Sequence, residues 1–192
     1  MSNNAGRVQV ESRAQWRAWL AENHTQADGI WLVTFKKQMG DKYLPYDDIV
    51  EEALCFGWVD SLPRKLDDER TMLYISPRRK GSPWSRLNKT RVEKLIAAGL
   101  MTEAGMTLIE QAKADGAWTI YDEVEDLIIP PDLAAALAAN PDAQKHFAAF
   151  SDSAKKGILW WIKSAKRAAT REKRINETVR LAAQNIKANF PA

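Results

Sequence analysis

The residues best suited to chemistry lie in one short basic segment, Ser76–Lys89. This segment combines cations and hydroxyl groups with a glycine that lets the backbone turn tightly. Arginine and lysine bind phosphate groups, and arginine does so through paired hydrogen bonds. The sequence therefore predicts an anion site here. Its predicted ligands are Arg78, Arg79, Lys80, Gly81, Ser82, Trp84, Ser85, Arg86 and Lys89.

The same segment also predicts the start of a helix. Ser82 is a favourable N-cap residue, and Pro83 is favoured at the first helical position. A helix N-terminus presents unpaired N–H groups that attract anions, which would add backbone donors to the cations. A capped, solvated helix start without any ligand remains the alternative interpretation.

A second candidate is the turn Phe56–Ser61, which carries an aromatic ring, a carboxylate and a hydroxyl group. Such a turn can present its side chains into a pocket. In the alternative interpretation Asp60 accepts hydrogen bonds from local N–H groups or pairs with Arg64. The predicted pocket residues are Trp58, Asp60, Ser61 and Arg64.

Other chemistry finds little support in the residue pattern. Cys55 is the only cysteine, and its place near a predicted helix C-terminus disfavours a reactive thiolate. His24 and His146 are the only histidines, and no zinc-ligand spacing surrounds them. No nucleotide-binding glycine loop and no serine nucleophile motif occur. We therefore expect no metal, no cofactor and no catalytic residue. A non-enzymatic protein is favoured over an enzyme.

Hydrophobic patterning predicts the elements that would position these groups. The run 30–37 is apolar on both sides at its start, which favours an inner strand. Two short strands are expected at 59–66 and 71–76, and Pro63 places the first of them at a sheet edge. A helix is expected after Pro45.

Beyond the last predicted strand the pattern becomes helical. It predicts an α+β protein, in which a small N-terminal α/β lobe with a short mixed or antiparallel sheet precedes a mainly helical C-terminal part. The predicted segments are the lobe 1–76, a basic loop with packed helices at 77–121, an acidic proline-containing linker at 122–131, and a helical lobe at 132–192.

Charge is distributed in blocks. The formal net charge is +3, which by itself identifies no partner. A rival basic patch lies at 154–174, and we interpret it as a solvated helix face partly neutralised by the acidic stretch 115–132. No apolar export segment and no membrane-spanning run is present, so we expect a cytoplasmic bacterial protein.

Several of these motifs together resemble the YdeI/OmpD-associated family, also described as bacteriocin-protection proteins. The resemblance extends over nearly the whole chain. It implies a role in tolerance to cationic antimicrobial peptides and supplies no catalytic residue. Where the family pattern has a glycine, this chain has Ser61. The residues that carry the resemblance are Ala53–Asp60, Pro77-Arg78-Arg79, Trp84-Ser85, Asn88-Lys89, Leu159–Ile162, Ala165-Lys166-Arg167 and Thr170-Arg171.

Three hypotheses about function follow. The preferred one is a non-enzymatic module that binds a phosphate-bearing small molecule or a nucleic-acid backbone through the basic loop. The second is a small-molecule enzyme with a cleft around Trp58 and Asp60. The third is a protein-interaction adaptor that uses exposed tryptophans, of which the chain has eight in total.

Overall fold

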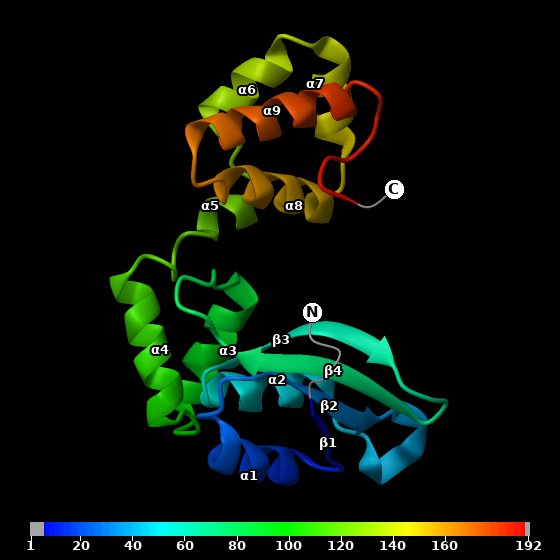
Figure 1. The fold of residues 1–192 in the computed structure, drawn as a ribbon, viewed down its shortest axis with the longest axis vertical. Coiled ribbons are helices and arrows are strands. Elements are labelled where there is room, and N and C mark those ends of the chain that lie inside the picture. The colour runs from blue at the N-terminus through cyan, green and yellow to red at the C-terminus, as the bar shows by residue number, and fades with distance from the viewer. Residues whose placement is uncertain (1–5, 191–192) are drawn as a thin grey trace. The chain divides into compact units, whose positions relative to one another are not determined.

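The structure, a computed structural model, describes residues 6–190 and shows two compact units that divide between Ile120 and Tyr121 (Figure 1). The first unit contains the sheet, and the second is helical. This confirms the predicted α+β class. The elements of the first unit are β1 (Arg7–Gln9), α1 (Arg13–Asn23), β2 (Ile30–Phe35), the 3-10 helix η1 (Lys37–Lys42), α2 (Tyr46–Cys55), β3 (Trp58–Lys65), β4 (Arg70–Pro77), α3 (Arg86–Ala97) and α4 (Glu103–Ala114).

The sheet has the strand order β1-β2-β4-β3. Strand β1 pairs with β2 in parallel, and the other two pairs are antiparallel, so the sheet is mixed. Strand β2 lies inside the sheet, as its two apolar sides predict. Strand β3 is an edge strand, and the register shifts between Asp60 and Pro63. The proline therefore lies on an edge strand next to an irregularity of the ladder, the positions at which a sheet tolerates proline.

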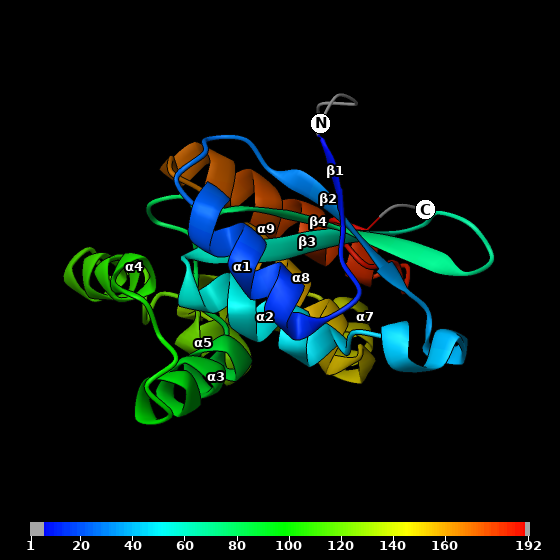
Figure 2. The ribbon, with the colours of Figure 1, turned by 90° about the horizontal axis from the view of Figure 1, so that it is seen from below.

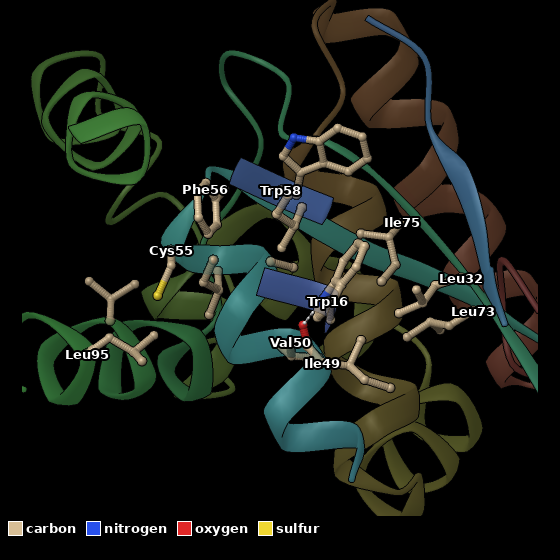
Figure 3. Close-up of a cluster of buried hydrophobic side chains, with 14 of the residues drawn as sticks. Trp16, Leu32, Ile49, Val50, Cys55, Phe56, Trp58, Leu73, Ile75 and Leu95 are labelled. Atoms are coloured by element: carbon tan, nitrogen blue, oxygen red, sulfur yellow. Dashed lines mark hydrogen bonds between the residues drawn. The ribbon is translucent and has the colours of Figure 1, made fainter. Parts of the chain in front are cut away.

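Helices α1 and α2 cover one face of this sheet (Figure 2). The fully buried Trp16 of α1 donates its Nε1–H to the carbonyl oxygen of Ile49 in α2, at 3.0 Å. Figure 3 shows this bond beside Leu32, Leu73 and Ile75, which come from the sheet. The hydrogen bond satisfies the indole inside an otherwise apolar core.

The second unit consists of α5 (Asp122–Glu125), α6 (Pro131–Ala138), α7 (Pro141–Ala149), α8 (Asp152–Lys163) and α9 (Ala168–Ala182). Its core contains Leu133, Phe147, Ile158 and Ile162. The segment predicted as an acidic linker contains helix α5, whose Val124 is buried in this core. Within residues 6–190, no helix has the length and apolar character needed to span a membrane.

Candidate functional site

The basic segment does not begin with a helix at Ser82. Helix α3 starts at Arg86, and Ser85 is its N-cap, accepting a hydrogen bond from the Asn88 N–H at 3.3 Å. The predicted cap at Ser82 is therefore wrong, because the Pro83 carbonyl accepts a hydrogen bond from the Arg78 side chain. That bond holds residues 78–85 as a loop. The unpaired N–H groups of the helix start therefore lie near Arg86, not near Ser82.

Arg78 is the centre of this loop. Its guanidinium lies 3.7 Å from the ring centroid of Trp84, and its Nη2 donates to the Pro83 carbonyl oxygen at 2.6 Å. Only 9% of the residue is exposed. Burial lowers the pKa of Arg78 to about 10, against a smaller opposite effect of the Asp60 carboxylate. The side chain therefore stays charged at neutral pH.

Two donors of this buried cation have no acceptor. The Arg78 Nε and Nη1 atoms lack any hydrogen-bond partner among the residues that the structure describes. A buried donor left unpaired costs about 1–3 kcal/mol, and more when it belongs to a charged group. The Pro83 carbonyl and the Trp84 ring compensate this guanidinium only in part, so its two remaining donors are the strongest candidate for ligand contacts in this loop.

The other predicted ligands lie around a small recess next to Arg78. Arg79, Lys80 and Gly81 are exposed, and Gly81 has a φ of 74° in the left-handed region that favours glycine. The recess has a volume of about 10 Å³, which admits about one water molecule. Its lining residues are Arg78, Arg79, Lys80, Gly81, Ser82, Trp84, Leu108, Gln111, Ala112 and Asp115.

Two predicted ligands follow the loop on helix α3. Arg86 is exposed at the first helical position. Lys89 lies one turn later, with its Nζ 5.6 Å from the ring centroid of Trp118. Neither residue lines the recess beside Arg78.

The four predicted pocket residues do not lie together in the structure. Trp58 is buried in the core, and its Nε1–H donates to the His24 carbonyl oxygen at 2.9 Å. Arg64 lies with its guanidinium 4.9 Å from the Trp31 ring centroid. The structure therefore places both side chains away from Asp60 and Ser61, and Asp60 does not pair with Arg64.

Asp60 and Ser61 line a pocket of about 720 Å³ on the helix-covered side of the sheet. The Tyr46 hydroxyl donates to the Asp60 Oδ2 at 2.6 Å. Burial and this hydrogen bond raise the pKa of Tyr46 to about 12. The lining residues are Thr34, Phe35, Lys36, Lys37, Tyr43, Leu44, Tyr46, Ile49, Asp60, Ser61, Pro63, Thr71, Met72 and Leu73.

Sequence reasoning missed Tyr46 and Thr34 in this pocket. Tyr46 is the first residue of α2, and its bond to Asp60 depends on how α2 lies on the sheet. Thr34 could have been suspected, since it is a hydroxyl on the core-facing side of an inner strand. The sequence alone does not show that this threonine is buried or that it lines a pocket.

Cys55 is buried. It is the last residue of helix α2, and burial is the main cause that raises the pKa of its thiol. Both observations agree with an unreactive thiol. Among residues 6–190 no cluster of three or more histidine, cysteine or acidic side chains could hold a metal ion.

The rival basic patch is partly neutralised by the acidic stretch. Lys163 pairs with Glu123 at 2.6 Å, and Arg171 pairs with Asp132 at 2.6 Å. Lys166 is exposed. These pairs support the interpretation of this patch as a solvated helix face.

Two family models match the chain, and each covers a different part. A domain of unknown function, DUF8412, matches residues 8–108. The model described as "bacteriocin-protection, YdeI or OmpD-associated" matches residues 126–185. The predicted resemblance is thus confirmed for the helical unit, whereas the motifs at 53–60 and 77–89 fall in the other match. No curated protein and no solved structure gives a significant match.

Proposed function

The chain belongs to the DUF8412 family and carries a YdeI/OmpD-associated domain in its second unit, and from this premise we propose that the first unit is a non-enzymatic anion-binding module. The proposed ligand is a small molecule with a phosphate group. The proposed centre of the site is Arg78, assisted by the exposed cations Arg79 and Lys80.

The observation that supports this proposal is the buried guanidinium of Arg78 with two unpaired donors. The Nε–H and the Nη1 N–H groups are charge-assisted donors, the kind that bind the oxygens of a phosphate or carboxylate. An anion bound there would provide the missing acceptors and compensate the charge. Trp84 packs against the guanidinium, with 3.7 Å from its ring centroid to the Arg78 Cζ, and so restricts the directions of these donors.

The size of the recess determines how the anion would enter. A volume of about 10 Å³ is too small for a phosphate group, so residues 79–82 would have to move outward on binding. Gly81 permits this movement, because no atom lies within 4 Å of the position that a Cβ would occupy. One narrow recess fits a single anionic group better than a nucleic-acid backbone, which remains the alternative ligand.

The other two hypotheses have less support from the contacts. The enzyme hypothesis placed Trp58 and Asp60 in one cleft, whereas Trp58 is buried in the core. The adaptor hypothesis needs exposed tryptophans, and each of the eight, all within the described residues, is buried or half-buried. We propose that any protective effect against cationic peptides is indirect, since a net charge of +3 repels them.

To test this proposal, the protein is titrated with inorganic phosphate while its tryptophan fluorescence is recorded. We expect Arg78→Met to abolish the response and Arg78→Lys to weaken binding by about tenfold or more, because lysine lacks the paired donors. The double variant Lys166→Ala/Arg167→Ala, in the second unit, is the matched control and should bind like the wild type. Circular dichroism would confirm that each variant is folded.

The proposal is refuted if folded Arg78→Met responds to phosphate like the wild type, or if the control variant alone loses the response. A single-stranded dodecamer distinguishes the alternative ligand. Binding of the oligonucleotide that exceeds phosphate binding and falls steeply with salt would instead identify a nucleic-acid site.

A further inference from the structure

The pocket beside Asp60 exists because the helical layer ends before the sheet does. Figures 1 and 2 show the long β3–β4 hairpin and the η1 segment at the same end of the first unit. Paired residues in the sheet share a face, so Thr34 and Thr71 point to the same side as Leu32 and Leu73. Helix α2 covers only part of that side, and the pocket lies beyond its first residues.

The walls of this pocket are largely apolar. Phe35, Leu44, Ile49 and Leu73 are all buried core residues, and each of them contributes to the lining. A volume of about 720 Å³ falls in the range typical of small-molecule sites, which are apolar with a few polar groups. The polar groups therefore decide which ligand fits.

One polar group is a threonine without a partner. Thr34 is 4% exposed, and its hydroxyl has no hydrogen-bond partner among the described residues. The hydroxyl lines the pocket. Among the described residues the fully buried side-chain atoms without a partner belong to Arg78, so the Thr34 hydroxyl carries no comparable burial cost and is available for a hydrogen bond inside the pocket.

The other polar group is the Asp60 carboxylate. Tyr46 donates to its Oδ2, which leaves Oδ1 without a partner. Two lysines also line the pocket: Lys36 donates to the carbonyl oxygens of Asp67 and Asp68, and Lys37 is exposed. The register shift between Asp60 and Pro63 is a feature that often re-aims side chains beside binding sites.

We propose that this pocket binds a compact, mainly apolar molecule whose polar end is an amine. The apolar body lies against Leu44, Ile49 and Leu73, and the amine donates hydrogen bonds to the Asp60 carboxylate and the Thr34 hydroxyl. The pocket shares no lining residue with the recess at Arg78, although the Asp60 carboxylate also acts electrostatically on Arg78.

Three probes with the same phenyl group and different ends test this proposal: 2-phenylethylamine, 2-phenylethanol and 3-phenylpropionate. Binding is measured from chemical-shift changes in ¹H–¹⁵N spectra of the full chain. We expect the amine to bind at least about tenfold more tightly than the carboxylate, because the charge of Asp60 attracts one and repels the other. The alcohol should lie between them.

Four variants identify the groups responsible. Asp60→Asn should remove the preference for the amine, whereas Asp68→Asn, an exposed carboxylate in the β3–β4 turn, should retain it. Thr34→Val should weaken amine binding without loss of stability, and Leu44→Trp should block all three probes by filling the pocket. The proposal is overturned if the carboxylate binds as tightly as the amine, or if folded Leu44→Trp and Asp60→Asn both bind like the wild type.

Discussion

The substitution Glu52→Ala gives the sharpest test of how the first unit is held together. Glu52 lies on α2 and is 2% exposed. Its Oε1 accepts from the Arg13 Nε at 2.6 Å, and its Oε2 accepts from the Arg17 Nη1 at 2.7 Å. Both arginines belong to α1, so this one carboxylate joins the two helices that cover the sheet.

The expected cost follows from these two bonds. A hydrogen bond between charged groups contributes about 1.5–3 kcal/mol, so the two together would give about 3–6 kcal/mol. About a third of each arginine side chain is exposed, and Arg13 keeps Asp48 and Glu51 as partners. Water can therefore replace part of the loss, and we expect a decrease of about 2–3 kcal/mol in the free energy of unfolding.

Urea unfolding followed by tryptophan fluorescence measures this decrease. A loss of that size moves the midpoint by about 1 M in urea. Glu52→Gln, which keeps the volume, should cost less than Glu52→Ala. Asp48→Ala removes a partly exposed partner of the same Arg13 and should cost less than about 1 kcal/mol. If Glu52→Ala and Asp48→Ala lower the free energy of unfolding equally, the burial of Glu52 does not contribute to stability.

Three further predictions concern other parts of the chain. Cys55 should react with a thiol reagent far more slowly in native than in denatured protein, and Cys55→Ala should cost about 1 kcal/mol through lost packing without affecting phosphate binding. Gly105→Ala should destabilise the first unit by about 2 kcal/mol or more in urea unfolding, since its Cβ would collide with the Cys55 carbonyl oxygen; an unchanged midpoint would contradict this close packing. Arg171 lowers the pKa of the Asp132 carboxyl, so the stabilisation is present above about pH 4 and is lost as the pH falls through the lowered pKa. Asp132→Asn should therefore reduce the unfolding free energy of the second unit by less than about 1 kcal/mol at neutral pH, and this effect should shrink as the pH falls through the lowered pKa; a pH-independent effect would exclude this ion pair as its cause.

The sequence by itself determined several elements of the first unit, because local patterns encode them. The inner strand β2, the edge position of β3 and the helix after Pro45 all followed from hydrophobic periodicity and from the missing N–H of proline. The position of Cys55 near the end of this helix followed from the sequence as well, and it argued against a reactive thiolate. The cytoplasmic location stays a prediction.

Only the tertiary structure decided what the polar residues do. The sequence placed the start of a helix at Ser82, and the hydrogen bond from Arg78 to the Pro83 carbonyl moved it to Arg86. Composition showed a cluster of cations, but only three-dimensional packing buried one of them on Trp84 without acceptors. Likewise, Tyr46 and Asp60 lie 14 positions apart and meet because α2 packs on the sheet. Hydrophobic patterning specifies which face is buried, whereas the partners of a polar group depend on contacts between segments distant in sequence.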